Sequence, residues 1–207
     1  MLFRSEIPAS TFVPPGIFAG YTPRGGHAYD PARAKLLLAA AGYPNGGRLR
    51  GVTFLFRSDN PVSRTAAQNY THQWKEKLNL DIPLESIENK IARSRLNDKD
   101  YALAASNWIG DYGDPSTFTD KYGSNSDNND SAWVNKTYDD LLYQAAKEPD
   151  AARRMELLEQ AEKLLNDEAA IIPLYHVTNQ YLFRSNVHGI NLNPRNTTIF
   201  KAVYVER

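Results

Sequence analysis

Apolar residues recur at helical spacing in three stretches of the chain, and each stretch predicts a helix. These are residues 30–41, 63–78 and 149–168, where apolar side chains lie three or four positions apart. The expected core faces are Ala34, Leu37, Leu38 and Ala41 in the first, Ala66, Tyr70, Trp74 and Leu78 in the second, and Leu157, Leu158, Ala161, Leu164 and Leu165 in the third. The third helix is the most clearly amphipathic, because the side opposite its apolar stripe is charged.

Particular residues predict the ends of these helices. Asp30 is a favoured N-cap, and Pro31 suits the first helical turn, where its missing N–H is not needed. Gly42 and Asn79 suit the left-handed backbone position that often follows the last residue of a helix. The first two helices therefore have expected ends at these residues.

Strands are predicted between the helices. Runs of apolar, β-branched and aromatic residues place them at residues 52–56, 82–87, 101–105, 171–175, 180–183 and 200–205. Two more helices are expected, one over residues 90–97 and one from Thr137, where Asp140 three positions later suggests a capping box. Because strands and helices alternate, the sequence predicts an α/β domain with a mixed sheet flanked by helices.

The composition excludes several classes of protein. Lys plus Arg and Asp plus Glu both number 24, so the chain lacks the excess of positive charge that favours nucleic-acid binding. The absence of cysteine excludes disulfides and thiolate metal sites. The longest strongly apolar stretch, residues 36–41, is far shorter than the roughly 20 residues that span a membrane. Residues 1–8 lack the pattern of a signal peptide.

The most informative segment follows the predicted strand at 101–105. Residues 107–118 contain the indole of Trp108, the carboxylates of Asp111 and Asp114, and two glycines. Ligands of α/β proteins bind at the ends of strands. A carboxylate beside a large aromatic ring suggests a small cationic or amphipathic ligand. Asp111 either faces such a ligand or only turns the chain. Asp114, which precedes Pro115, suits a helix N-cap.

The same segment resembles a known family. Trp108-x-x-Asp111-Tyr112-x-Asp114-Pro115-x-x-Phe118 is similar to a segment of the peptide-type solute-binding proteins of ABC importers, the bacterial extracellular solute-binding proteins of family 5. Further similar segments lie at residues 29–37, 41–44, 128–131 and 171–175. All of them occur in the family's order, and together they cover nearly the whole chain.

The resemblance implies one lobe of a two-lobed, periplasmic-binding-protein-like fold of type II. Family members are more than twice as long, with a signal peptide and a large first lobe ahead of the matched region. We therefore expect a C-terminal fragment with an irregular lead-in at 1–29, an α/β ligand-binding lobe at 30–185 and a tail at 186–207. The tail should cross back toward the first lobe, so residues 199–205 should find little support here. The expected localisation is periplasmic or otherwise extracytoplasmic, and the expected state is monomeric.

The resemblance also implies transport rather than catalysis. A peptide would bind between two lobes, without a cofactor, and be delivered to a membrane-embedded ABC permease. In the family, the residue at the position of Asp111 pairs with the α-ammonium of the peptide, and Asn107, Trp108 and Ile109 are carried over as further contacts. Some members have an Arg three residues before the Trp, where it can pair with the carboxylate of a short peptide. Here that position is Ala105, which leaves the ligand length open.

The sequence is compatible with other functions. Related receptors bind nickel complexes, haem or sugars, and a single Asp does not exclude such ligands. A carboxylate-pair hydrolase would use Asp111 and Asp114 as acid and base, which requires opposed environments for the two groups. Residues 125–136 resemble a calcium loop but lack its Gly and its bidentate Glu, so we expect a polar loop and no metal site. His176 either faces the cleft or is hydrogen-bonded within the structure.

Overall fold

The chain divides into two compact units. The computed structural model describes residues 6–59, 61–192 and 198–206. Unit 1 contains the residues up to His27, Trp108–Ser126 and those from Val134 onward, and unit 2 contains Ala28–Asn107 and Asp127–Trp133. This division cuts across the lobe expected at residues 30–185, whose bounds stay a prediction about the larger protein.

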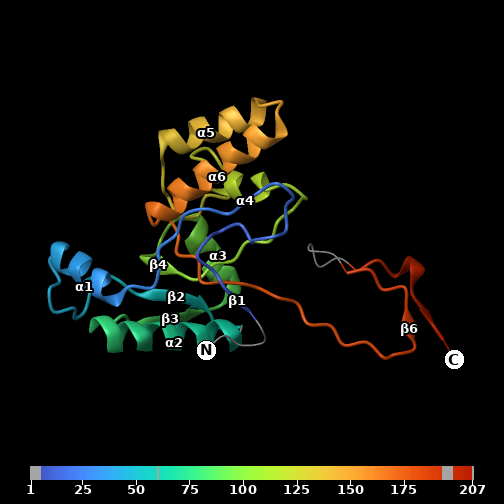
Figure 1. The fold of residues 1–207 in the computed structure, drawn as a ribbon. Helices are drawn as coiled ribbons and strands as arrows, with labels where there is room; N and C mark the ends of the chain where they lie inside the picture. Colours follow the sequence, from blue (N-terminus) through green and yellow to red (C-terminus); the bar gives the residue numbers. More distant parts are fainter. Residues whose placement is uncertain (1–5, 60, 193–197, 207) are drawn as a thin grey trace. The chain divides into compact units, whose positions relative to one another are not determined.

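Unit 2 is built on a three-stranded parallel sheet in the order β3-β2-β4 (Figure 1). The strands are β2 (Phe54–Arg57), β3 (Leu84–Ile87) and β4 (Leu103–Ala104). Phe54, Leu55 and Phe56 are each at most 5% exposed, and because successive side chains alternate, both faces of the central strand are buried. The three strands predicted in this part of the chain are therefore confirmed, with bounds that differ by up to two residues.

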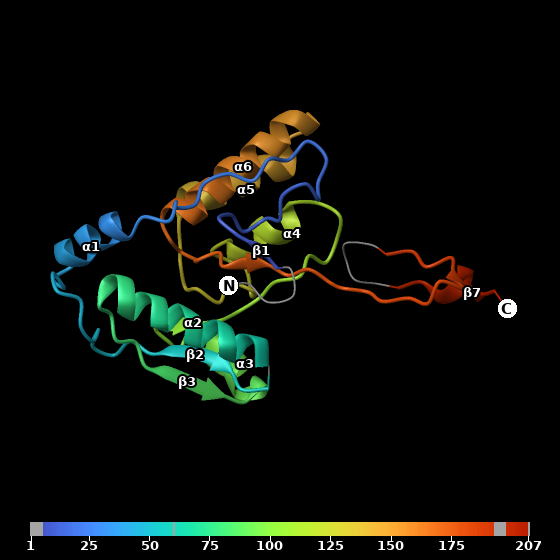
Figure 2. The ribbon, with the colours of Figure 1, turned by 60° about the horizontal axis from the view of Figure 1, so that its bottom comes forward.

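Three helices complete unit 2 (Figure 2). They are α1 (Pro31–Ala40), α2 (Pro61–Leu78) and α3 (Asn89–Asn97). The carboxylate of Asp30 accepts the N–H of Arg33 at 2.9 Å, and Gly42 follows the helix with a φ of +91°, so both predicted ends of α1 are confirmed. Asn79 has a φ of +55°, as predicted for the end of α2.

The core of unit 2 lies between α2 and the sheet. Its buried residues are Phe54, Phe56, Ala67, Leu80 and Ile82, against which Leu38, Tyr70, Trp74 and Leu78 pack. The face predicted for α2 is confirmed, except that Ala67 rather than Ala66 is the buried alanine. The expectation for α1 is wrong at Leu37, which is 61% exposed, and at Ala41, which is also exposed. The residue of α1 that packs against this core is Leu38.

Unit 1 is built on a helical hairpin beside which a short helix and a turn are placed (Figure 1). These elements are α5 (Lys136–Lys147), α6 (Ala151–Asp167), α4 (Ser116–Thr119) and the 3-10 turn η1 (Asp120–Tyr122). The predicted stripe of α6 is confirmed, since Leu157, Leu158, Ala161 and Leu165 are at most 3% exposed. The capping box predicted at Thr137 is wrong. The N-cap of α5 is Asn135, a stronger capping residue, whose side-chain oxygen accepts the N–H of Tyr138 at 3.1 Å.

Two buried acids on α6 hold residues 12–27, which we name the N-terminal strap. Glu159 and Glu162 are 5% and 0% exposed, although they are charged residues outside the predicted apolar stripe of α6. The carboxylate of Glu162 accepts the backbone N–H of Val13 and the hydroxyl of Tyr21, each at 2.7 Å. Burial raises the pKa of Glu162, and these hydrogen bonds oppose the rise. The irregular lead-in is thus packed on a helix by specific polar contacts.

Short antiparallel pairs form the rest of unit 1. β1 (Ile7–Pro8) pairs with β5 (Tyr175–His176), and β6 (Val187–His188) pairs with β7 (Tyr204–Val205), just before which lies the 3-10 turn η2 (Phe200–Ala202). The strand predicted at 180–183 is absent from this described region. Leu182 there is 100% exposed, and an apolar run without a neighbouring strand forms no ladder. The described residues of the tail pair with one another, and the course of the tail toward a first lobe stays a prediction.

The predicted α/β class is confirmed. Parallel and antiparallel pairing both occur, but in separate sheets of the described chain. Among the described helices, none combines the length and the apolar character that crossing a membrane requires.

Candidate functional site

The candidate binding segment leaves β4 and reaches α4 without regular secondary structure over residues 105–110. In unit 1 it is fixed instead by Thr117 of α4. The indole N–H of Trp108 donates to the carbonyl oxygen of Thr117 at 2.7 Å, and the backbone N–H of Asp111 donates to the Thr117 hydroxyl at 2.8 Å. Two of the predicted site residues are therefore held by one residue that the sequence analysis did not single out.

Trp108 packs against the core of unit 1 and is also partly exposed. This core contains Val13 and Phe118. The ammonium of Lys121, a residue only 4% exposed, lies 5.2 Å from the centre of the indole ring. A cation of the protein thus already occupies a face of this ring. The indole can form a wall for a ligand, whereas it is a poor platform for a second cation.

Asp111 and Ile109 face solvent. Ile109 is 65% exposed, and Asp111 is exposed as well. Within the described residues, the Asp111 carboxylate has neither a hydrogen bond nor an ion pair. An exposed carboxylate on a fixed backbone can accept hydrogen bonds from a cation.

Asn107, the fourth predicted residue, belongs to unit 2. It is exposed, and its side chain makes no hydrogen bond with another described residue of that unit. Its neighbour Ser106 donates a hydrogen bond to the Asp130 carboxylate at 3.3 Å. The amide of Asn107 is therefore available, but its place relative to the residues of unit 1 stays a prediction.

Asp114 has the structural role that its position before Pro115 predicts, with a partner that the sequence did not reveal. Its carboxylate accepts the N–H of Ser116, the first residue of α4, at 3.0 Å, although Pro115 itself occupies the cap position. Arg154 of α6 donates to both carboxylate oxygens, at 2.7 and 2.8 Å. This guanidinium lowers the pKa of Asp114 to about 2.

The geometry gives no support to a carboxylate-pair hydrolase. A general acid must carry a proton near neutral pH, and the lowered pKa keeps Asp114 ionised and bound to Arg154. Among the described residues, no basic side chain pairs with the Asp111 carboxylate. Asp114 is therefore held in an ion pair and does not serve as the general acid of such a site.

The polar loop resembling a calcium site holds itself together with side-chain hydrogen bonds. Asn129 is 6% exposed; its amide oxygen accepts the N–H of Ser131 at 3.2 Å, and its amide nitrogen donates to the carbonyl of Trp133 at 2.9 Å. The described residues contain no group of acids and histidines that could hold a metal ion.

His176 lies in β5, where burial lowers its pKa.

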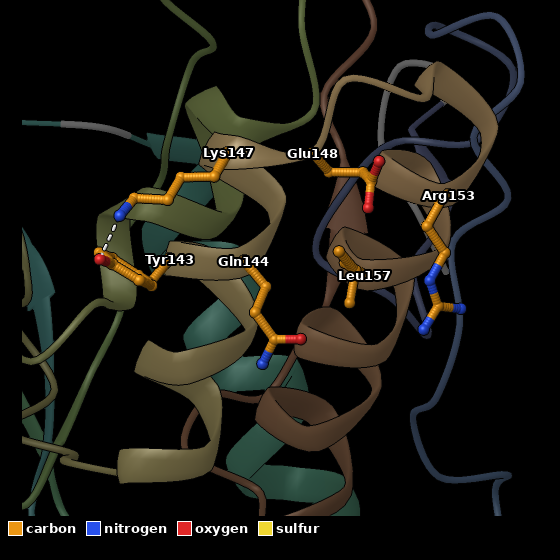
Figure 3. Close-up of a pocket in the computed structure, with 6 residues that line it drawn as sticks. All are labelled: Tyr143, Gln144, Lys147, Glu148, Arg153 and Leu157. Carbon is orange, nitrogen blue, oxygen red and sulfur yellow. Dashed lines mark hydrogen bonds between the residues drawn. The ribbon is translucent and has the colours of Figure 1, made fainter.

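A concave surface lies at the turn between α5 and α6, away from the predicted site residues (Figure 3). This depression of about 380 Å³ is lined by Tyr143, Gln144, Lys147, Glu148, Arg153 and Leu157. The ammonium of Lys147 donates to the hydroxyl of Tyr143 across its rim. None of the predicted site residues lines this depression. Arg153 pairs with Glu156, and Glu148 accepts the N–H of Asp150.

Comparison with known proteins gives a consistent result along the chain. The family model of the bacterial extracellular solute-binding proteins, family 5 Middle, matches residues 1–130. The chain is 31% identical to the periplasmic murein peptide-binding protein MppA of Escherichia coli (strain K12), over 99% of this chain and 39% of that protein. It is also 31% identical to the "Probable deoxycholate-binding periplasmic protein YgiS" of the same strain, over 96% of this chain and 38% of that protein.

Solved structures agree with the sequence matches. A periplasmic oligopeptide-binding protein of Borrelia burgdorferi, OppAIV, superposes with a TM-score of 0.84 at 27% identity, covering 98% of this chain and 41% of that chain. The chain thus spans 39% of the length of MppA and a similar share of the other two proteins. The fold and the family expected from the segment around Trp108 and Asp111 are confirmed: the chain belongs to the bacterial extracellular solute-binding proteins of family 5.

Proposed function

We propose that the protein carrying this chain is the substrate-binding component of an ABC importer and that it binds peptides through Asp111. The observation that carries the proposal is an exposed, unpaired carboxylate on a backbone that Thr117 fixes. Support also comes from relatives whose names state what they bind, a murein peptide for MppA and oligopeptides for OppAIV. Such a component makes and breaks no covalent bond.

A peptide offers an α-ammonium, a backbone and variable side chains. The Asp111 carboxylate matches the first of these, and a charge-assisted hydrogen bond of this kind contributes about 1.5–3 kcal/mol. Its larger effect is on selectivity, because a carboxylate enclosed by a ligand without a cation loses its hydration and gains nothing in return. The site therefore selects the end of a peptide and leaves its side chains less restricted.

The neighbouring residues suit the remainder of such a ligand. Ile109, 65% exposed, offers an apolar contact, and the irregular segment leaves backbone groups free of a sheet ladder. Trp108 serves as a wall, since its N–H is bonded to Thr117 and Lys121 lies over its ring. Asn107 supplies a further amide. Trp108, Ile109 and Asp111 of unit 1 form one side of the proposed site, and the part of the receptor outside this chain supplies the enclosure.

A different ligand on the same fold is the second candidate, and the relative YgiS, named for binding deoxycholate, favours it. Deoxycholate is an amphipathic anion, and haem also carries carboxylates. The unpaired charge of Asp111 repels anions and attracts cations. The site chemistry therefore supports a cationic peptide terminus over these anionic ligands, while nickel complexes and sugars remain outcomes of the test.

Delivery to a permease completes the proposal. In such receptors the ligand binds between two lobes, and the lobes close on it by a hinge motion. The closed form then presents the ligand to a membrane partner. The periplasmic names of MppA and YgiS support an extracytoplasmic location. The permease itself is membrane-embedded, and this receptor component acts as its partner outside the cytoplasm.

Replacement of Asp111 by Asn in the full-length receptor tests the proposal. We expect peptide affinity to fall by roughly tenfold to 150-fold in calorimetry, the equivalent of one charge-assisted hydrogen bond. Asp127→Asn is the matched control, because Asp127 is also exposed and forms no ion pair among the described residues. Unchanged affinity in Asp111→Asn would remove this residue from the site. Native mass spectrometry of the receptor from cells that reveals a co-purified non-peptide ligand would contradict the peptide assignment.

A further inference from the structure

Thr117 connects α4 to the two predicted ligand residues of unit 1. Its hydroxyl accepts the backbone N–H of Asp111, and its carbonyl accepts the indole N–H of Trp108. Thr117 is 3% exposed, so water competes little for these groups. One buried residue therefore fixes both the carboxylate-bearing residue and the aromatic wall.

Gly110, between those two residues, is seated on the same surface. A Cβ atom at this position would lie 3.0 Å from Cγ2 of Thr117 and 3.1 Å from Cε2 of Phe118. Both distances are shorter than an ordinary van der Waals contact. The backbone of the binding segment is thus packed directly on α4, and the absence of a side chain at Gly110 permits this approach.

We propose that Thr117 is a positioning residue of the peptide site, which directs the carboxylate of Asp111 toward the α-ammonium of the ligand. This inference rests on the proposed function. The last backbone hydrogen bond to the sheet comes from the N–H of Ala105, which donates to the carbonyl of Leu55 at 2.8 Å, and residues 106–110 are in neither a helix nor a strand. The Thr117 hydroxyl therefore takes the part that a sheet ladder would otherwise have. Because hydrogen bonds weaken steeply when their geometry changes, a loosened Asp111 discriminates poorly between ligands with and without the ammonium.

The chain offers a matched control in the same short helix. Thr119 is 0% exposed, and its hydroxyl has no hydrogen-bond partner among the described residues. Thr117→Val and Thr119→Val therefore make the same chemical change at two buried positions, and only the first removes a hydrogen bond to the binding segment. Thr117→Ser retains the hydroxyl and loses a methyl group.

The test compares short alanine peptides of several lengths with their N-acetylated forms in the full-length receptor. Calorimetry gives the ratio of the two dissociation constants for each variant. We expect Thr117→Val to lower this ratio by about three- to tenfold, the equivalent of one hydrogen bond, while Thr117→Ser and Thr119→Val keep it within about twofold. A purely structural role would weaken both peptide forms equally and leave the ratio unchanged in Thr117→Val, which would overturn the inference.

Asp111→Asn separates this inference from the proposed function. In that variant, Thr117→Val should change the ratio no further, since the carboxylate that Thr117 positions is gone. If Asp111→Asn leaves the ratio unchanged, or if no peptide binds the wild-type receptor, the proposed function fails and the inference fails with it. If Asp111→Asn abolishes the preference and Thr117→Val does not alter it, only the inference is overturned.

Discussion

Arg154 binds both carboxylate oxygens of Asp114, at 2.7 and 2.8 Å, although the two residues lie 40 positions apart in the sequence. This ion pair joins α6 to the start of α4. Asp114 lies three residues after Asp111 and also accepts the N–H of Ser116. The pair therefore fixes the helix on which Thr117 holds Asp111.

Loss of this ion pair should weaken both stability and ligand binding. Arg154→Gln leaves a half-buried carboxylate without its bidentate donor, and we expect the free energy of unfolding of the full-length receptor to fall by about 1–3 kcal/mol. Arg153→Gln is the control, because Arg153 forms an exposed pair with Glu156 that contributes less than about 1 kcal/mol. Chemical denaturation measures both. Equal effects of the two variants would contradict a special role for Arg154.

The ion pair should persist into moderately acidic solution. The folded pKa of Asp114 is lowered to about 2, against an ordinary value of about 3.9. Its contribution to stability is therefore complete above the ordinary pKa and is lost as the pH falls toward about 2. The stability difference between wild type and Arg154→Gln should stay constant from about pH 7 to pH 5 and shrink below about pH 4. A difference that already shrinks near pH 6 would show that another group is responsible.

Glu162 should give the opposite pH dependence. Burial raises its pKa in the folded state above the ordinary value of about 4.3, so its favourable contribution is complete below that value and is lost as the pH rises through the raised pKa. The stability of wild type minus that of Glu162→Gln should therefore be larger near about pH 4 than near pH 7. Denaturation of both proteins across this range measures the difference. A difference that grows with pH would contradict the assignment.

The N-cap of α5 offers a direct comparison between the prediction and the structure. Asn135→Ala removes the acceptor of the Tyr138 N–H and also the amide that donates to Glu168 at 2.9 Å. We expect a loss of about 1 kcal/mol in the free energy of unfolding, the usual effect of removing a cap. Thr137→Ala should change stability by less than about 0.5 kcal/mol, because Thr137 is an exposed residue inside the helix. A larger loss at Thr137 would favour the capping box predicted from sequence.

Gly20 and Gly26 both have a left-handed backbone, but only Gly26 is closely approached by another segment. Substituting each in turn therefore distinguishes the cost of backbone strain from the cost of a steric clash. Gly26 has a φ of +83°, and a Cβ there would lie 1.8 Å from the carbonyl oxygen of Ser10, whereas Gly20 has a φ of +76° with open space around it. Gly20→Ala should cost about 1–2 kcal/mol, the penalty of a left-handed backbone for a residue with a Cβ. Gly26→Ala should cost more, since the backbone of Ser10 must also move. Thermal unfolding of the two variants checks the order, and equal losses would contradict the close approach.

Local patterns predicted most of the regular structure. The three long helices and the three strands of the parallel sheet follow from periodicity and β-branched runs, and Asp30 and Gly42 mark the ends of α1 because capping depends on residues near in sequence. The motif around Asp111 also predicted the family. Failures occurred where a distant neighbour decides: residues 180–183 found no strand to pair with, and Leu37 of α1 did not reach the core.

The sequence by itself determined the α/β class and the family and pointed to the candidate binding segment, since these depend on local propensity and on residues close together in the chain. Only the tertiary structure decided which charges have partners. Arg154 and Glu162 are charged residues of one helix, yet the first binds Asp114 and the second is 0% exposed beneath the N-terminal strap. Likewise, nothing in the sequence marks Thr117 as the support of Asp111. Ion pairs and buried hydrogen bonds between distant segments arise from packing, which periodicity does not encode.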